Sequence, residues 1–521
     1  MRTALWKIGL LGLSLTTAAG IGVLLTGCDQ GCDVDATCVY GTSSGGTVDD
    51  ACPADPADGP VGPECGIWVS ASNGDDSSPG TQQQPVQTLT QAITLAQTGS
   101  KRVYACGEKY QEAVILSSGV SLFGGFDCAH AWKYVGTSAR ATILGTAAQI
   151  PLVFSGGDEP SLAGNVEVHA ADAVKPGGSS IAVLVQDYAQ GALRRADLFA
   201  GNGADGGDGV DGGHEGTVKD GLPGKDGVDA CTVNPGSGGA SVKLSCGDGT
   251  FSLGGPGGDG GDLVASSGGE GLPLPDPNPD ELGIGGKGEA SSPVCTPGHG
   301  GIQGITGTDG VPVEQDGLRR ITNDGVVLGG DGGDGTPGLP GQGGGGGGGS
   351  FGNALTCGAA PPGGGGGGSG GTGGCGGKGG RGGQQGGASI ALVVRSEAFR
   401  FAGIHATSAN GGNGGRGGQS QPGGKGGLAG TGGSAFGGPG GVHSGCAGGN
   451  GGNGGTRGHG AGGRGGDSIA VAEVGMPDVE LGENSGKYRG HAGHGGKGGN
   501  PAAPELDGRD GFVGPNLQYD P

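Results

Sequence analysis

Glycine spacing constrains this chain more than any other feature of its sequence. Of 521 residues, 141 are glycine, about 27%, and they concentrate after residue 200, where many fall in triplets. Glycine at every third position suits a bundle of polyglycine II strands, extended helices with three residues per turn whose backbones can approach closely. The alternative is a flexible linker, which the runs Gly343–Gly349 and Gly363–Gly368 would also suit. Collagen is excluded because only 30 residues are proline, whereas collagen needs roughly 15–20% imino acids.

Cysteine placement favours the ordered bundle over the linker. Ordering costs glycine more backbone entropy than any other residue, and cross-links offset part of that cost. Six cysteines lie within or beside the glycine-rich tracts: Cys231, Cys246, Cys295, Cys357, Cys375 and Cys446. The chain has 13 cysteines, so 12 remain beside Cys28, an even number that suits disulfides in an exported protein. The local pairs that we expect are Cys32 with Cys38, Cys52 with Cys65, and Cys231 with Cys246.

The first 27 residues have the pattern of a secretory signal peptide, with Arg2 and Lys7 before an apolar stretch over residues 8–25. The stretch ends in Leu25-Thr26-Gly27-Cys28, which resembles the lipobox of bacterial lipoproteins. This resemblance implies cleavage before Cys28 and acylation of that cysteine, for example with palmitate, so that the protein is anchored in a lipid bilayer of the cell envelope. We expect the outer membrane or cell surface rather than the inner membrane. The alternative is an uncleaved transmembrane helix, for which this stretch has the minimum length.

The following 170 or so residues divide into an acidic segment and a strand-rich segment. Residues 29–66 contain eight acidic and no basic residues, so we interpret 28–66 as an acidic tether. Residues 67–200 have less glycine and recurrent β-branched residues. An apolar stripe at helical spacing, flanked by capping residues Thr88 and Gly99, predicts one helix over 88–98. The predicted strands are Gly66–Ser70, Arg102–Cys106, Val114–Leu116, Val120–Phe123, Thr142–Leu144, Leu152–Phe154, Val166–His169, Ile181–Val185 and Asp197–Phe199.

Three motifs in this segment carry a second resemblance. They are N-G-D…S-P-G-T…P-V-Q-T-L…A-I from Asn73, V-Y-A-C-G…Y-Q-E from Val103, and V-S-L-F-G-G-F from Val120. Together they resemble the N-terminal cap and first coils of a pectin-lyase-like right-handed β-helix, and more closely a family of uncharacterised exported bacterial β-helix proteins. The resemblance implies an all-β right-handed parallel β-helix with a short N-terminal capping α-helix. Cys106 and Cys128 are one coil apart, 22 residues, so we expect them to stack and form a disulfide.

A repeat cuts through the glycine-rich part of the chain. Ser180, Ser389 and Ser468 each begin S-I-A-[VL], followed by strand-like sequence and then glycine-rich triplets, and a degenerate fourth copy is expected at Ala240-Ser241-Val242. This organisation is similar to that of bacterial polymorphic GC-rich repetitive sequence (PGRS) proteins. We therefore expect the coils to continue, with glycine-rich excursions leaving them at one corner. The expected divisions are glycine-rich excursions over 201–385, β-helix repeats with glycine-rich loops over 386–500, and a C-terminal tail over 501–521.

Candidate catalytic and metal-binding residues are dispersed. Three matches to G-G-x-G-x-D, ending at Asp211, Asp259 and Asp334, make calcium the one cofactor considered, but the apolar position that follows in calcium-binding repeats is missing. No metal or cofactor site is therefore assigned. A glycan hydrolase would need two neighbouring carboxylates, and the candidates occur singly: Glu112, Asp127, Asp187 and Asp197. The histidines considered as ligands are His459, His491 and His494. No catalytic residue is assigned, so we do not expect an enzyme.

The net charge of the chain limits the classes of molecule that it can bind. The formal net charge of −22 argues against nucleic acid, because phosphate binding needs a basic face. Residues 376–500 carry 11 basic and 6 acidic residues, a net charge of +5, and this segment could meet acidic surface polysaccharide or lipid. The sequence thus predicts an envelope-anchored lipoprotein with a structural, adhesive or glycan-binding role toward surface polysaccharide or other surface proteins. The alternative is a polysaccharide lyase or hydrolase on the same fold.

Overall fold

The computed structural model describes residues 52–520, except 148, 263, 290–293, 314–318, 439, 476–485 and 489. The signal peptide, Cys28 and the expected Cys32–Cys38 pair lie outside the described residues. Within the described ranges, no helix has the length and hydropathy that crossing a bilayer requires.

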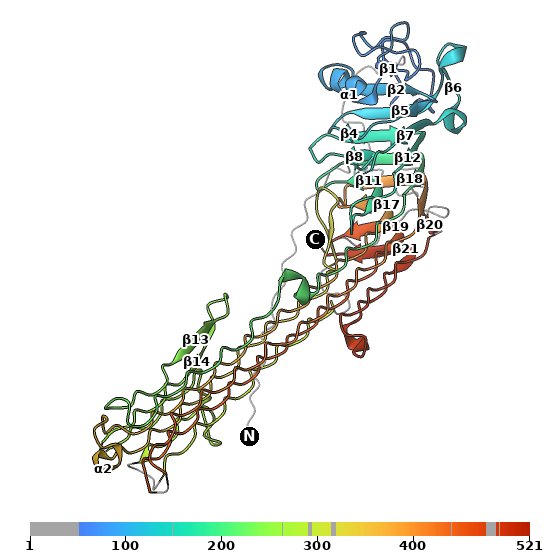
Figure 1. Cartoon of the computed structure of the whole chain (residues 1–521). Helices are drawn as coiled ribbons and strands as arrows, with labels where there is room; N and C mark the ends of the chain where they lie inside the picture. The colour runs from blue at the N-terminus through green and yellow to red at the C-terminus, as the bar shows by residue number, and fades with distance from the viewer. Residues whose placement is uncertain are drawn as a thin grey trace, which may run out of the picture. The chain divides into compact units, whose positions relative to one another are not determined.

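Parallel β-sheets make up one part of the fold (Figure 1). The larger sheet contains β1 (Ile67–Val69), β2 (Arg102–Cys106), β3 (Lys109–Tyr110), β5 (Ser121–Asp127), β6 (Lys133–Tyr134), β7 (Ala141–Leu144), β9 (Ser161–Gly164), β10 (Val166–His169), β12 (Gly191–Phe199), β18 (Phe399–Ser408) and β20 (Gly486–Tyr488). The second sheet contains β4 (Val114–Leu116), β8 (Leu152–Phe154), β11 (Ser180–Val185), β17 (Ser389–Val394), β19 (Ser468–Val474) and β21 (Val513–Tyr519). Apart from β6, every pairing in both sheets is parallel. The protein is therefore all-β with parallel sheets, as predicted.

The larger sheet changes partners along β12. Residues Gly191–Arg194 pair with β9, whereas Asp197–Phe199 pair with β10. Between them, Arg195 has a φ of 51°, a left-handed conformation that bends the strand. β18 pairs with both halves of β12.

Alternating side chains of both sheets fill one apolar core. Its fully buried members include Ile143, Val168 and Leu198 on neighbouring strands of the larger sheet. Helix α1 (Leu89–Thr98) packs its predicted stripe of Leu89, Ala92, Ile93 and Ala96 into this core. Thr88 caps the helix by accepting a hydrogen bond from the backbone N–H of Gln91, and Gly99 ends it. The predicted helix is thus confirmed with its caps.

Two outer sheet faces are covered by other segments of the chain. Trp68, Tyr104 and Phe126 form an aromatic cluster on the outside of β1, β2 and β5, against which Cys52, Val61 and Cys65 pack. The expected tether spans residues 28–66, and its described part therefore lies on the larger sheet. On the second sheet, a further apolar cluster includes Ile321 and Val327 of the hairpin β15 (Arg320–Ile321) and β16 (Val327–Leu328).

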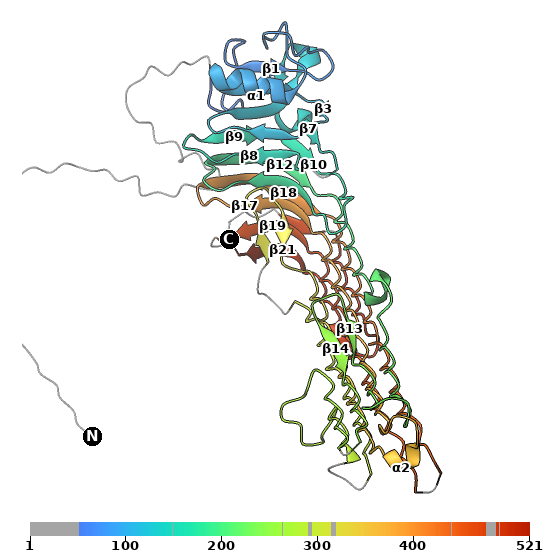
Figure 2. The same ribbon diagram turned by 60° about the vertical axis from the view of Figure 1, so that its left-hand side comes forward.

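Glycine-rich excursions leave and rejoin the sheets at matching places (Figure 2). The chain leaves after β12, β18 and β20, which pair side by side, and returns at β17, β19 and β21, which do the same. Within the repeat, Ser180 pairs with Ser389 and Ser389 with Ser468. Ser389 Oγ donates to Gly201 O at 2.7 Å, and Ser468 Oγ donates to Ala409 O at 2.7 Å. The repeated serine therefore fastens each returning strand to the start of the excursion from which that strand returns.

The excursions associate through hydrogen bonds at every third residue. We call the following segments the glycine bundle: 201–230, 255–261, 266–271, 283–288, 296–311, 329–350, 363–387, 410–434, 445–466, 490–499 and 506–511. Every third amide over 368–386 donates to every third carbonyl over 446–464 in ascending order, so these two segments are parallel. Every third amide over 412–433 donates to carbonyls over 387–366 in descending order, so those two are antiparallel. The linker interpretation is wrong for these tracts.

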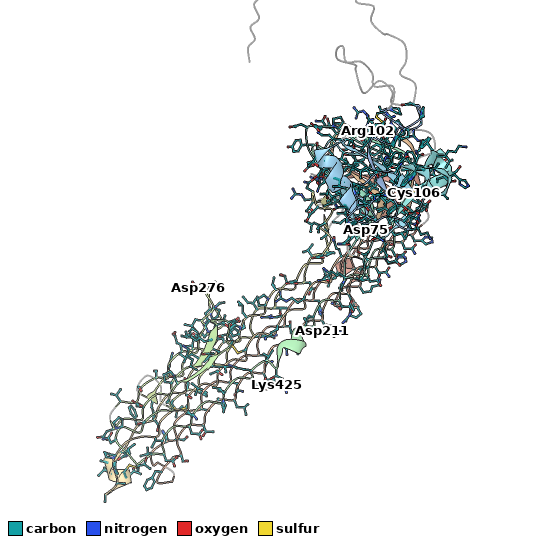
Figure 3. All side chains as sticks on the ribbon, turned by 90° about the horizontal axis from the view of Figure 1, so that it is seen from above. Asp75, Arg102, Cys106, Asp211, Asp276 and Lys425 are labelled. Carbon is teal, nitrogen blue, oxygen red and sulfur yellow. A yellow bond between two sulfur atoms is a disulfide. The ribbon has the colours of Figure 1, made fainter. Side chains whose placement is uncertain are left out.

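The run Gly343–Gly349 lies inside the bundle. Its amides donate in strict rotation to three segments, 266–272, 368–371 and 296–299. Its carbonyls accept from Gly255 and Gly258, from Gly286, and from Gly449. The three residues of each turn therefore point in three directions, and each of them meets the backbone of a neighbouring segment. A Cβ on Gly344, for example, would lie 2.0 Å from Gly449 O. Poly-glycine is required here because no direction is left for a side chain. In Figure 3, side chains crowd the strands but are spaced apart along the bundle, where Asp211 and Lys425 are labelled.

Two predictions fail within the excursions. Residues Val242–Ser245 are not a fourth repeat: they form β13, which pairs antiparallel with β14 (Phe251–Gly254). Cys231 and Cys246 do not pair with each other, because the bundle places each beside a distant segment. The disulfides are Cys231–Cys357, Cys246–Cys375 and Cys295–Cys446, beside Cys52–Cys65 and Cys106–Cys128. The short helix α2 (Ala354–Cys357) holds one of these cysteines.

Candidate functional site

A row of polar side chains crosses the outside of the larger sheet, and we call it the polar ladder. Its members lie in register on five parallel strands: Lys109, Thr142, Glu167, Asp197 and His405 on β3, β7, β10, β12 and β18. The alternation of a strand explains the row, because the next residue on each strand points inward and is buried. Lys109 and His405 are exposed, and Thr142, Glu167 and Asp197 are partly exposed. Unlike the aromatic cluster, the ladder therefore stays in contact with solvent.

Each ladder carboxylate has a basic partner. Arg140, just before β7, places its guanidinium 3.2 Å from Asp197 Oδ2. His169 places Nε2 2.6 Å from Glu167 Oε1, and its ring stacks on Phe199 with 4.5 Å between ring centroids. The ladder therefore offers donors and acceptors beside an aromatic ring within a few ångströms.

Asp197 has one carboxylate oxygen without a hydrogen-bond partner among the described residues. This oxygen, Oδ1, is shielded from solvent, whereas Oδ2 contacts Arg140. A buried acceptor without a partner costs free energy, roughly 1–3 kcal/mol. A ligand hydroxyl could bond to this oxygen only if the side chains that cover it moved aside. The arrangement suits a polyhydroxylated ligand, which presents many donors to a row of spaced acceptors.

The four carboxylates that the sequence suggested for catalysis lie apart. Glu112 accepts the backbone N–H groups of Leu89 and Thr90, at 2.8 and 3.0 Å, and so caps the N-terminus of α1. Asp127 contacts His130 at 2.8 Å. Asp187 pairs with Arg395 on the second sheet. Only Asp197 belongs to the ladder.

Sequence reasoning missed the partners of Asp197. Glu167 and His169 alternate with buried valines in V-E-V-H, residues 166–169. Charged residues on a strand whose other face is core were the available signal. His405 gave none, because its place beside Asp197 depends on a pairing between strands some 200 residues apart in the chain.

The aspartates of the calcium-like motifs accept hydrogen bonds within the glycine bundle. Asp208 and Asp211 accept the backbone N–H groups of Arg416 and Gln419, at 2.8 and 2.7 Å. Asp334 does the same for Gly382 at 2.7 Å. Asp259 accepts the backbone N–H of Gly238 at 2.8 Å. These carboxylates therefore lie in different parts of the bundle, each fastening one extended segment to another.

The three histidines that the sequence suggests as metal ligands do not form a cluster. His459 contacts Ser420 through both ring nitrogens, at 3.2 and 3.1 Å. The ring of His494 contacts Asp510 at 3.5 Å, and His491 donates its backbone N–H to Asn410. Among the described residues, only Cys52, Glu64 and Cys65 cluster at metal-ligand spacing, and the two cysteines are joined in a disulfide.

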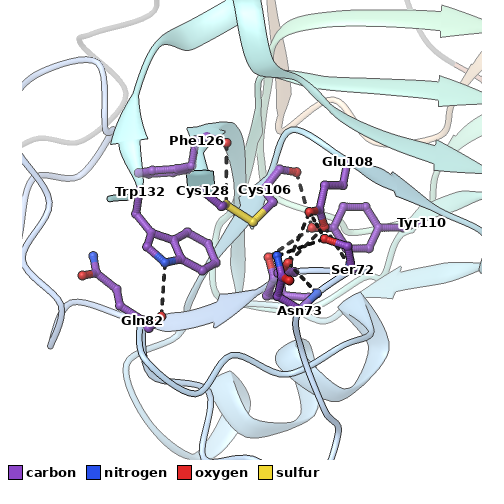
Figure 4. The surroundings of a disulfide bond; sticks show 11 residues. Ser72, Asn73, Gln82, Cys106, Glu108, Tyr110, Phe126, Cys128 and Trp132 are labelled. Carbon is purple, nitrogen blue, oxygen red and sulfur yellow. Dashed lines mark hydrogen bonds between the residues drawn. A yellow bond between two sulfur atoms is a disulfide. The ribbon is translucent and has the colours of Figure 1, made fainter. Parts of the chain in front are cut away.

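The disulfide Cys106–Cys128 lies beside a second polar cluster, around Glu108 (Figure 4). Ser72 donates to Glu108 from its hydroxyl at 2.5 Å and from its backbone N–H at 3.2 Å. Tyr110 is buried below, and its hydroxyl donates to Val69 O and Cys106 O at 3.1 and 3.3 Å. Burial, with Glu108 nearby, raises the pKa of Tyr110 well above its usual range. The contacts of Glu108 hold the turn that follows β1, so this carboxylate has a structural role.

Comparisons with known proteins match only one part of the chain. Residues 72–128 match the model of a family described as a protein of unknown function (DUF1565). The match spans α1, β2 and both cysteines of the Cys106–Cys128 disulfide. No curated protein and no solved structure matches the chain.

Proposed function

We propose that this chain is an exported, lipid-anchored envelope protein that binds glycans on the polar ladder. In this proposal Cys28 carries the acyl anchor, at the outer membrane or cell surface. The parallel sheets are coils of a right-handed β-helix closed at its N-terminal end by α1, as in the exported bacterial proteins that residues 67–200 resemble. The glycine bundle, made of polyglycine II helices, is the structural part. The observation that carries the binding role is the solvent-accessible row of donors and acceptors beside the ring of Phe199.

Strand order supports the β-helix. Along the chain, a strand of the second sheet is followed by the two halves of a bent strand of the larger sheet, first as β11 and β12 and then as β17 and β18. Each strand pairs in parallel with its counterpart in the next turn of the pattern. A right-handed crossover is the rule for such connections. Stacked coils give a long, stiff face, which suits recognition of a linear polymer.

A second candidate is hydrolysis of a glycan at the same place. Glu167 and Asp197 lie in register on neighbouring strands, which are about 4.8 Å apart. Glycosidases use two carboxylates at separations from about 5 Å upward. At this separation, one carboxyl group would protonate the leaving oxygen while the other carboxylate attacks the anomeric carbon and breaks the C–O bond. Water would then release the sugar from this ester, giving its proton to the first carboxylate.

The two candidates separate in one experiment. The soluble chain from Asp29 onward is passed over immobilised polygalacturonate, alginate or dextran, each with and without calcium. Retention without release of new reducing ends supports binding, and release of reducing ends supports hydrolysis. Asp197→Asn should lower retention at least tenfold, whereas Glu270→Gln, an exposed carboxylate in the glycine-rich part, should leave it unchanged. Equal retention by both variants, or none by the unmodified chain, would overturn the ladder as the site.

Anchoring and location need their own tests. Cells fed radiolabelled palmitate should label the full-length protein, and the variant Cys28→Ala should lose that label. Protease added to intact cells should cut a surface protein. If the protein survives on intact cells but is cut after lysis, the surface role fails.

A further inference from the structure

A second site lies on the other sheet, at the turns that follow β8, β11 and β17. Val185 of β11 pairs with Phe154 of β8 and with Val394 of β17, so these turns stack one above another. They surround an open cavity of about 650 Å³. The side chains that matter for its chemistry are Asp158, Asp187, Tyr188, Gln190, Arg395 and Glu397.

Tyr188 presents its ring to solvent from a fixed backbone. Tyr188 is 83% exposed. Its backbone has a φ of 62°, a conformation that is costly for a bulky residue. Neighbouring hydrogen bonds hold the turn: Gly157 N–H donates to Tyr188 O at 3.3 Å, and Ser396 Oγ donates to Ala189 O at 2.6 Å. An exposed aromatic ring held in a strained conformation serves as a platform for a ligand ring.

The cavity carries excess negative charge. Arg395 is turned toward Asp187, with Nε 3.0 Å from Oδ1 and a terminal nitrogen 3.2 Å from Oδ2, so this pair neutralises itself. Asp158 and Glu397 are exposed and have no ion-pair partner among the described residues. Three carboxylates and one guanidinium leave a formal charge of −2. Repulsion therefore disfavours an acidic glycan here and favours a cationic ligand.

We propose that this cavity binds a glycan with free amino groups, such as a run of glucosamine units. A sugar ring stacks on Tyr188, and its ammonium group lies between Asp158 and Glu397, where ring face and carboxylates both attract a cation. Gln190 supplies hydrogen bonds to ring hydroxyls. A lysine-rich peptide would satisfy the charge but has no ring to stack on Tyr188. The proposal is independent of the polar ladder, which lies on the other sheet.

The test measures binding of a glucosamine hexamer to the soluble chain from Asp29 onward by titration calorimetry. The N-acetylated hexamer, which lacks the charge, and hexalysine, which lacks the rings, are the matched probes. The glucosamine hexamer should bind at least tenfold more tightly than either probe. The double variant Asp158→Asn, Glu397→Gln should weaken it at least tenfold.

Tyr188→Asn tests the platform without adding strain, because asparagine tolerates a positive φ. It should weaken the glucosamine hexamer at least tenfold, whereas Tyr188→Trp should retain binding. Glu270→Gln, which lies in neither site, is the control and should change nothing. Failure here is distinct from failure of the ladder, because the ladder is tested with polygalacturonate, alginate and dextran. The proposal is overturned if the hexamer does not bind, if the charge variant binds equally, or if hexalysine binds as tightly and Tyr188→Asn has no effect.

Discussion

Adding one methyl group inside the glycine bundle should loosen it. Gly370 donates its N–H to Gly255 O at 2.8 Å, and a Cβ on Gly370 would lie only 1.8 Å from Gly344 O. Ordinary contacts between such atoms are about 3.5 Å, so Gly370→Ala must push two packed segments apart by more than an ångström. Gly344 O also accepts the N–H of Gly255, and its segment is enclosed on every side.

The cost follows from packing and hydrogen bonding together. Overpacking in a filled interior costs about 1–3 kcal/mol, and losing one buried backbone hydrogen bond adds about 1–3 kcal/mol. A local destabilisation of about 4 kcal/mol raises the open fraction of the bundle nearly a thousandfold. Gly213→Ala is the matched control, because nothing lies within 4 Å of a Cβ there. It should change stability by less than about 1 kcal/mol.

Amide hydrogen exchange measures this directly. Peptides covering residues 341–350 and 363–375 should exchange two to three orders of magnitude faster in Gly370→Ala than in the unmodified chain, while peptides of β10 and β12 stay protected. Gly213→Ala should match the unmodified chain everywhere. If Gly370→Ala leaves the protection of 341–350 unchanged, the close packing that we describe is wrong.

Three further outcomes follow from the same contacts. Non-reducing peptide mapping should recover Cys231–Cys357 and Cys246–Cys375, and recovery of Cys231–Cys246 would refute the arrangement of the segments. Tyr519 is buried and its hydroxyl donates to Asp467 at 2.8 Å, so Tyr519→Phe should lower the free energy of unfolding by about 1–2 kcal/mol, and an unchanged melting temperature would contradict this. Thr431 donates its backbone N–H and its hydroxyl to Asp226, and these hydrogen bonds lower the pKa of that carboxyl group. The ionised carboxylate therefore stabilises the bundle at pH values above the pKa of an unfolded aspartate, about 4. This contribution is lost as the pH falls through the lowered pKa of the folded state. As the pH falls from about 4 to about 2, hydrogen exchange of the Thr431 amide should therefore become faster, after correction for intrinsic rates. This rise should vanish in Asp226→Asn, which keeps a neutral acceptor. An equal rise in that variant would refute the role of the carboxylate.

Local pattern was enough to predict much of the fold. The stripe from Leu89 to Ala96 and its caps define α1 because they lie within one helix. The strands Arg102–Cys106 and Leu152–Phe154 were predicted with the bounds that the structure has. The repeat shows the serine in the sequence, but it does not show the hydrogen bond from that serine to the start of the same excursion.

Features that depend on distant pairings escaped sequence reasoning. Cys231 meets Cys357 because segment 201–230 runs antiparallel to segment 363–387, which adjacency in sequence does not indicate. The aspartates after glycine looked like cation ligands, but an Asp at each third residue also reaches the amides of a neighbouring strand, as Asp208 does. The polar ladder is assembled from five strands, so no single stretch of sequence contains it.

The most direct test of the proposed function compares the unmodified soluble chain from Asp29 onward with its Asp197→Asn variant on immobilised polygalacturonate, alginate and dextran. We predict that the unmodified chain is retained by at least one of these glycans and that Asp197→Asn loses at least nine tenths of that retention. Equal retention of the two proteins, or no retention of either, would contradict glycan binding at the polar ladder.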